Sequence, residues 1–247
     1  MSRYGNRPVD IVRWAPRRLN PPNPLWGSNG VAFGPDGRLY VAQFLAGQIS
    51  AVDPATGDVE VVVPMDGPVR SPDDLAFGAD GSMYIADLVP GRVVAVGEDD
   101  AIRVLADGLD RPADVAFDGE GRCYVSDEGA GAVLRIEADA PPTVVADGLD
   151  APQGLAVLGE ELFTVETGRR RLCAVSPVTG ETRIDAEDLP VGTPPGVVPG
   201  AEPALFAHGM PGMARRFAGL AAGPDGTLLL SANGEGTVWR LTPVERS

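Results

Sequence analysis

The sequence predicts an all-β fold, a single β-propeller, and three observations point to it. Two apolar runs around a turn recur five times, as in GVAFGPDGRLYVAQ (30–43), DLAFGADGSMYIAD (74–87) and DVAFDGEGRCYVSD (114–127). The first steps between aligned alanines (32, 76, 116 and 156) are 44, 40 and 40 residues. Gly (32) and Pro (24) are abundant, which suits many short strands joined by tight turns. Four short strands in about 40 residues are typical of a propeller blade.

Each repeat continues with a third and a fourth apolar run. The third runs lie at 47–53, 91–97, 131–137 and 170–176, and the fourth at 59–63, 102–106, 143–146 and 182–186. The last repeat stops after its third run, 237–243, and has no fourth. The N-terminal stretch VDIVRWA (9–15) is a candidate for the missing strand. We expect it to close the ring, because pairing the two ends removes an exposed sheet edge.

The spacing of the repeats does not by itself determine the number of blades. The step from Ala156 to Ala221 is 65 residues, too long for one blade and too short for two. Within it, GVVPGAEPALFAHG (196–209) aligns with residues 30–43 and indicates the first two strands of a reduced blade. We therefore predict six blades, one of them reduced, in a single domain of residues 1–247, with 187–218 as the reduced blade or a lid segment. The alternative is five blades and a long loop over one face.

Charge and composition limit the classes of molecule that the protein is expected to bind. The formal net charge is −15, and such a surface repels phosphate backbones and anionic lipids. We expect a small-molecule substrate and neither nucleic acid nor membrane. No apolar run approaches a membrane span, and the N-terminus lacks the apolar region of a signal peptide, which predicts a cytoplasmic protein. Cys123 and Cys173 have no metal-ligand spacing and are expected to be buried, reduced thiols.

The acidic residues of each repeat fall at two edges of the blade. In an up-and-down sheet, the first strand begins and the second strand ends at the same edge, while the turn between them lies at the opposite one. Asp36, Asp80, Glu120 and Asp225 stand just before a glycine in that turn and are predicted to be structural. The other edge is predicted to border the mouth of the central channel.

Oxygen-bearing side chains gather at that second edge. First strands begin near Asn29, Asp73, Asp74, Asp114 and Gln153, and second strands end near Asp87, Asp127, Glu166, His208 and Asn233. Hard oxygen ligands suit Ca²⁺ or Mg²⁺, so the sequence predicts a divalent cation held by Asn29, Asp73, Asp74 and Asp114. The alternative is that these groups cap strand ends and bind water in the channel.

Catalytic roles are predicted for three residues of this edge. His208, the one histidine of the chain, would act as a general base near neutral pH, or it is an ordinary packed or surface residue. Glu166 occupies the same aligned step in the preceding repeat and would orient His208 or share proton transfer. Asp127 is the third candidate.

Substrate-binding roles are predicted for Trp26, Asp87, Gln153, Arg215 and Asn233. Trp26 would wall a pocket or pack the ring closure. Arg215, in GMPGMARRF (209–217), would meet an anionic group of the substrate, or its segment is a solvated basic loop.

The repeated pattern x-G-[LV]-A-x-G-P-D-G-x-[LM]-Y-[VI]-[AS]-[DE] resembles the NHL-repeat and gluconolactonase/strictosidine-synthase-like β-propellers over nearly the whole chain. The resemblance implies a six-bladed hydrolase with a divalent cation, often Ca²⁺, at the channel mouth. Asn29 in SNGVA resembles that group's P-N-G-[LM]-A ligand motif, and Asp73 in PDDLA resembles its P-D-G-[LM]-A motif. The glutamate expected before the tryptophan of the first blade, here Trp26, is absent from PNPLWG (22–27). The repeats also resemble those of virginiamycin B lyase, which implies elimination with a His and a Glu, here His208 and Glu166.

Three functions follow as hypotheses. The leading one is a metal-assisted hydrolase of a lactone or related ester at the channel mouth. The second is a lyase, isomerase or cyclase that acts on a natural product by acid–base chemistry. The third is a non-catalytic binding propeller. The sequence contains no phosphate-binding loop, no serine nucleophile elbow and no Cys-His zinc pattern, so a nucleotide-binding protein, a serine hydrolase and a zinc protein are poorly supported.

Overall fold

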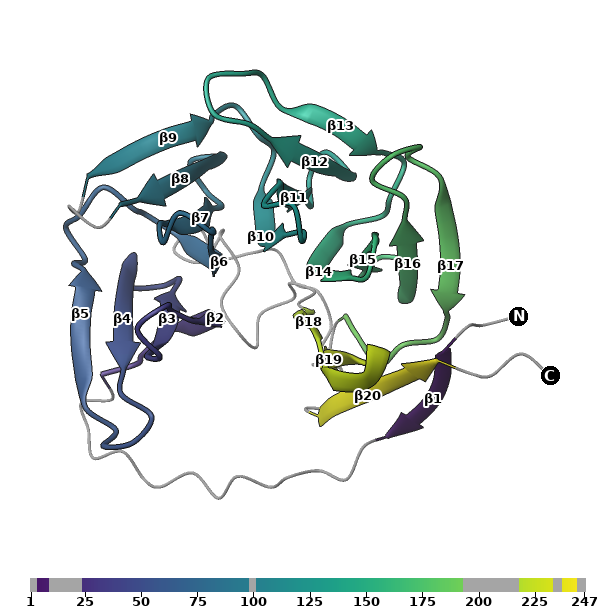
Figure 1. Ribbon diagram of the computed structural model, residues 1–247, viewed down its shortest axis with the longest axis horizontal. Coiled ribbons are helices and arrows are strands. Elements are labelled where there is room, and N and C mark those ends of the chain that lie inside the picture. Colours follow the sequence, from purple (N-terminus) through teal and green to yellow (C-terminus); the bar gives the residue numbers. More distant parts are fainter. Residues whose placement is uncertain (1–3, 9–23, 98–100, 193–217, 233–236, 244–247) are drawn as a thin grey trace, which may run out of the picture. The chain divides into compact units, whose positions relative to one another are not determined.

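The computed structural model describes residues 4–8, 24–97, 101–192, 218–232 and 237–243 (Figure 1). These residues form five four-stranded sheets and one short 3-10 helix, Pro224–Gly226. The fold is therefore an all-β propeller with five blades, as the five-blade alternative predicted. The six-blade prediction is not confirmed, and the segment aligned with a reduced blade (196–209) lies outside the described residues.

Four blades follow the order of the sequence, from the first strand to the fourth. The first blade contains β2 (Ser28–Phe33), β3 (Leu39–Gln43), β4 (Gln48–Val52) and β5 (Val59–Val63), and the second contains β6 (Pro72–Phe77), β7 (Met83–Asp87), β8 (Arg92–Val96) and β9 (Ile102–Ala106). The third contains β10 (Pro112–Phe117), β11 (Cys123–Asp127), β12 (Ala132–Ile136) and β13 (Thr143–Ala146), and the fourth contains β14 (Pro152–Leu158), β15 (Glu161–Glu166), β16 (Arg171–Val175) and β17 (Thr182–Ala186).

The fifth blade joins the two ends of the chain. Its strands are β18 (Leu220–Ala222), β19 (Leu228–Ala232), β20 (Thr237–Pro243) and the N-terminal β1 (Tyr4–Pro8). β1 pairs antiparallel with β20, with Tyr4 opposite Pro243 and Pro8 opposite Trp239. The N-terminal strand thus supplies the missing fourth strand, as predicted. It is formed by residues 4–8, however, and the predicted stretch 9–15 lies outside the described residues.

The chain divides into two compact units. Unit 1 comprises residues 1–11, 126–135 and 143–247, and unit 2 comprises residues 12–125 and 136–142. Unit 2 holds the first and second blades together with β10. Unit 1 holds the fourth and fifth blades together with β13. No helix of the described chain is long and apolar enough to cross a membrane.

The core of unit 2 is built by the alternation of apolar side chains along the strands. Ile49 and Ile85 are fully buried, and aromatic pairs join successive blades. The ring of Tyr40 on β3 meets that of Phe77 on β6 edge to face, with centroids 4.8 Å apart. Tyr84 on β7 meets Phe117 on β10 in the same way, also at 4.8 Å. Such pairs add to the free energy of area burial, and here they tie each second strand to the next first strand.

The core of unit 1 depends on a close approach between β14 and β18. Apolar side chains of both blades bury together, among them Phe163, Leu228 and Leu241. A Cβ atom added to Gly154 on β14 would lie 2.6 Å from the backbone nitrogen of Leu220 and 2.8 Å from the carbonyl oxygen of Ala218. Only a residue without a side chain lets the two first strands come this close.

The turn acids of the first two blades are structural, as predicted. Asp36 accepts the backbone N–H of Arg38 (3.1 Å), and Asp80 accepts that of Ser82 (3.1 Å). In the third blade Glu120 forms an ion pair with Arg122, which fits a structural role, but another acid binds the turn amides.

Asp118 takes the turn position in the third blade. It accepts the backbone N–H groups of Glu120 (3.0 Å) and Arg122 (2.9 Å) and the hydroxyl of Tyr124 (3.1 Å). Asp118 aligns with Gly34 and Gly78 of the first two blades, and Glu120, at the position of Asp36 and Asp80, pairs at the surface with Arg122.

We expect Gly154→Ala to lower the free energy of unfolding by about 1–3 kcal/mol, because the added methyl group meets backbone atoms that cannot move aside cheaply. Gly119→Ala is the matched control, since its Cβ would meet nothing within 4 Å. Urea unfolding followed by circular dichroism measures both variants. Equal stabilities would contradict the close approach of β14 and β18.

Candidate functional site

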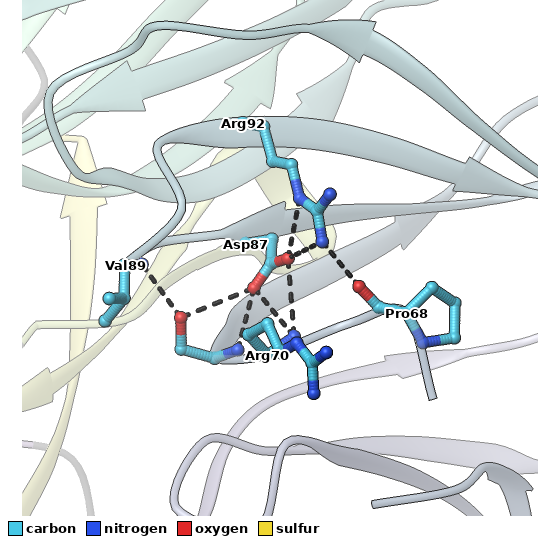
Figure 2. Close-up of polar contacts among 6 residues, drawn as sticks. Pro68, Arg70, Asp87, Val89 and Arg92 are labelled. Atoms are coloured by element: carbon cyan, nitrogen blue, oxygen red, sulfur yellow. Dashed lines mark hydrogen bonds and ion pairs between the residues drawn. The ribbon is translucent and has the colours of Figure 1, made fainter. Parts of the chain in front are cut away.

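The second strand of the second blade ends in a buried carboxylate, Asp87, that binds the segment before its own first strand (Figure 2). Asp87 accepts the backbone N–H groups of Arg70 (3.1 Å) and Ser71 (2.7 Å). The guanidinium of Arg92, at the start of β8, donates to it from Nε (2.9 Å) and Nη2 (2.8 Å), and also donates to the carbonyl of Pro68. The carboxylate predicted to bind substrate is thus engaged on both oxygens within the fold.

Glu166 ends the second strand of the fourth blade and has an equivalent environment. It is fully buried, and it accepts the backbone N–H of Asp150 (2.7 Å), Arg169 Nη1 (2.6 Å), Arg171 Nε and the thiol of Cys173 (3.0 Å). Burial alone would raise the pKa of Glu166, but these hydrogen bonds, led by that from Arg171, outweigh it and hold the pKa below the ordinary value. The group is therefore a stable anion and a weak base.

In the first blade, a neutral side chain at the end of the second strand binds the segment before the first strand. Gln43, which is 1 % exposed, donates from Nε2 to the carbonyls of Pro24 and Trp26, both at 3.0 Å. Its Oε1 accepts from Gln48 (2.9 Å) and Ser50 (2.6 Å). We call Gln43, Asp87 and Glu166 the strand-end clamps, since each holds the segment that leads into the first strand of its own blade.

Asp127 occupies the corresponding place in the third blade. It is 1 % exposed and accepts the backbone N–H of Ala130 (3.1 Å). The environments of Asp87, Asp127 and Glu166 fit structural roles, and the binding and catalytic roles inferred from the sequence stay predictions.

At the starts of the first strands in unit 2, polar side chains contact one another between neighbouring blades. β2, β6 and β10 follow one another side by side (Figure 1). Near the start of β2, Asn29 donates from Nδ2 to Oδ1 of Asp73 on β6, at 2.6 Å. Asn29 is exposed, whereas Asp73 is buried. Two residues predicted to act together as ligands therefore do meet, although 44 positions separate them in the sequence.

One residue further along, Asp74 on β6 hydrogen bonds with Asp114 on β10 through their carboxyl groups. Two carboxyl groups can share such a bond only when one of them carries the proton. Burial raises the pKa of Asp74, and the bonds with Asp114 and with the amides of Leu75 and Val115 lower it without cancelling the rise. Asp74 is half-buried and Asp114 is buried. We call Asp74 and Asp114 the carboxyl pair.

The carboxyl pair stands where other repeats have glycine. The aligned positions in the first, fourth and fifth blades are Gly30, Gly154 and Gly219. A Cβ atom on Gly30 would lie 2.0 Å from Oδ1 of Asp74, so the Asp74 side chain lies directly against the backbone of β2. The alignment contained this signal, but the interpretation as ion ligands did not predict a hydrogen-bonded pair.

The implied divalent cation can be tested against these donors. Asn29, Asp73, Asp74 and Asp114 offer hard oxygen atoms, which suit Ca²⁺ or Mg²⁺. In the described part of the chain, however, no three His, Cys, Asp or Glu side chains are grouped so that they could hold a metal ion. The described residues do not complete the implied ion site, and the cation stays a prediction. Elemental analysis tests it: one ion per chain would support it, and none after incubation with excess Ca²⁺ would contradict it.

The remaining predicted residues are partly described. Gln153, at the start of β14, is 3 % exposed and contacts the fifth blade. Trp26 is 53 % exposed, and both roles suggested for it, in a pocket wall or in packing the ring closure, stay predictions. His208, Arg215 and Asn233 lie outside the described residues.

Both cysteines are buried and free, as predicted. Burial raises the pKa of Cys123 to about 12. Burial and the hydrogen bond to Glu166 raise the pKa of Cys173 to about 12.

Comparisons with known proteins place this geometry in a fold group. No family profile matches the chain, and no curated protein matches its sequence. Virginiamycin B lyase from Staphylococcus aureus matches in structure with a TM-score of 0.63 and 14 % identity, over 92 % of this chain and 73 % of that one. A gluconolactonase-like protein matches with a TM-score of 0.63 and 16 % identity, over 87 % and 74 %. A chain of the nidogen/laminin complex matches with a TM-score of 0.63 and 19 % identity, over 84 % and 72 %. The chain thus has the fold of the gluconolactonase- and NHL-like β-propellers.

We expect Glu166→Gln to lower the free energy of unfolding by about 1–3 kcal/mol at neutral pH, because it removes charge-assisted hydrogen bonds from two partly exposed arginines to their buried counter-ion. The folded pKa of Glu166 lies below its ordinary value of 4.5, so its stabilisation is present above that pH and is lost as the pH falls through the folded pKa. The difference between wild type and variant should therefore shrink in acid. Urea unfolding across the pH range measures it, with the exposed Glu160→Gln as control. A difference that is constant with pH would refute the assignment.

Proposed function

We propose that this chain is an enzyme that hydrolyses a lactone or a related ester, and that Asn29, Asp73 and the carboxyl pair form its site. One observation carries the proposal: Asp74 and Asp114 share a hydrogen bond that requires one proton between two carboxyl groups. Such a pair presents an acid and a base together, as ester hydrolysis needs.

The reaction would use both halves of the pair. The ionised carboxylate takes a proton from a water molecule as the water oxygen bonds to the carbonyl carbon. The protonated carboxyl then gives its proton to the ring oxygen as the bond between that oxygen and the carbonyl carbon breaks. The products are a hydroxy acid and a carboxyl pair that again holds one proton, so the cycle closes without another reactant.

Asn29 is suited to hold the carbonyl oxygen. Its amide donates one N–H to Asp73 and keeps a second N–H, and the residue is exposed. A donor fixed by one hydrogen bond stabilises the negative charge that develops on a carbonyl oxygen during attack. Asp73 would then act as a positioning residue, because it sets the orientation of the Asn29 amide.

Charge supports a neutral substrate. Three carboxyl groups lie at these strand starts, and the whole chain carries a net charge of −15. A lactone is uncharged, whereas its hydrolysis product is an anion that this surface repels. The same field that disfavours anionic substrates would therefore favour release of the product.

The fold adds general support only. Proteins that share it include a lyase and a gluconolactonase-like protein. Fold does not determine reaction type, so the proposal rests on the carboxyl pair.

We expect Asp74→Asn and Asp114→Asn each to reduce kcat by about 10²- to 10⁴-fold with a smaller effect on KM, because each removes the shared proton relay. Hydrolysis of a panel of γ- and δ-lactones, followed by acid release at constant pH, measures the rates. Asp80→Asn is the matched control, since Asp80 lies in the turn and should leave kcat unchanged. The proposal fails if the wild type hydrolyses none of the lactones, or if both variants retain full activity.

A further inference from the structure

Gln153 in unit 1 holds an unusual position at the start of β14. The residue is 3 % exposed. Its side-chain Oε1 accepts the backbone N–H of Ala218 at 3.0 Å, across 65 residues of sequence. Its own carbonyl accepts the hydroxyl of the fully buried Ser126 at 2.6 Å. Gln153 is therefore fixed at both its backbone and its side chain.

The other end of the same amide has no acceptor. Nε2 of Gln153 is buried and makes no hydrogen bond within the described chain. Gln43 provides the contrast, since it is equally buried and both ends of its amide are satisfied by protein groups. A buried donor without an acceptor is costly, and native proteins leave few of them. The Gln153 amide therefore calls for an acceptor that the described residues do not supply.

The direction of this donor is set by its neighbours. Turning the amide over would place its NH₂ group against the N–H of Ala218, where two donors would face each other. Gly154, the next residue, lies so close to the backbone of Leu220 that β14 cannot shift toward β18. The two N–H bonds of Nε2 are thus held in place before any ligand arrives, which is the arrangement that stabilises a bound oxygen atom.

We propose that the Gln153 amide binds the carbonyl or carboxylate oxygen of a small ligand in unit 1. The acceptor must be an oxygen because an amide N–H bonds best to carbonyl-type oxygen atoms. Nε2 is buried, so the proposal requires the start of β14 to open transiently for the ligand to enter and then to return to the arrangement described above. The proposal does not rest on the proposed hydrolase function. Gln153 lies in unit 1, the proposed hydrolase site lies in unit 2, and the test measures ligand binding and not catalysis.

Nuclear magnetic resonance of the full chain tests this directly. The sequence contains three glutamines, at 43, 48 and 153, so selective ¹⁵N labelling of glutamine amides gives three side-chain signals. Gln153→Glu assigns the signal of interest, because it removes that amide while a carboxylate oxygen can still accept the N–H of Ala218. The probes are γ-butyrolactone, which offers a neutral carbonyl, and acetate, which offers a carboxylate.

We expect one probe to shift the Gln153 amide hydrogens saturably and to slow their exchange with water, with Gln43 and Gln48 unchanged. Gln153→Glu should weaken binding of that probe by about tenfold or more, the loss of one hydrogen bond to the ligand. If this variant fails to fold, Gln153→Met replaces it, and the wild-type titration decides alone.

Three results would overturn the proposal. The Gln153 signal does not move with either probe; the amide shows a persistent contact with a buried water, which would then be its acceptor; or the variant binds the probe as tightly as the wild type. If Asp74→Asn loses lactone hydrolysis but its Gln153 amide signal still shifts with the probe, the inference about Gln153 stands. If the wild type hydrolyses lactones but its Gln153 signal does not shift, only the inference about Gln153 fails.

Discussion

The strand-end clamps fix where the first strands of three blades begin. Each clamp binds the backbone a few residues before a first strand, and the next residues are those of the candidate sites. Gln43 holds the carbonyl of Trp26, just before Asn29. Asp87 holds the N–H of Ser71, just before Asp73. Glu166 holds the N–H of Asp150, shortly before Gln153. The polar groups at the strand ends thus position the polar groups at the strand starts.

The clamp carboxylates, Asp87 and Glu166, and the carboxyl pair, Asp74 and Asp114, differ in the groups that surround them. Each clamp carboxylate is buried beside an arginine from the start of the third strand, and in Glu166 the hydrogen bonds, led by that from Arg171, hold the pKa below its ordinary value. Asp74 is half-buried and lies beside another carboxyl group, and burial raises its pKa, so its proton is retained more strongly. An aspartate therefore accepts hydrogen bonds from amides and an arginine at one end of the strand pair, and shares a hydrogen bond with a second carboxyl group at the other. Burial of both types is tolerated because each has a partner that meets its charge or its proton.

Much of the fold was predictable from the repeats, because strand alternation and turn glycines depend on local sequence. The prediction that strand starts and strand ends share an edge followed from the same periodicity. The partners of the acids did not, because they come from backbone amides and from Arg92 and Arg171, which carry no repeating apolar signal. Asp118 binds the turn amides of the third blade from the position that aligns with Gly34 and Gly78, so an alignment of the acids before the turn glycine did not point to it. The N-terminal strand was misplaced because its residues, 4–8, are polar and resemble a loop.

The two buried thiols have a practical consequence. A thiol reacts with alkylating reagents as the thiolate, and both native cysteines are kept protonated and enclosed. The folded chain is therefore inert to maleimides. A single cysteine introduced in an exposed turn, for example at Ala79, becomes a unique attachment point for a dye, a spin label or a surface tether. The native pair then serves as an internal reporter, since their labelling marks the molecules whose blades have opened.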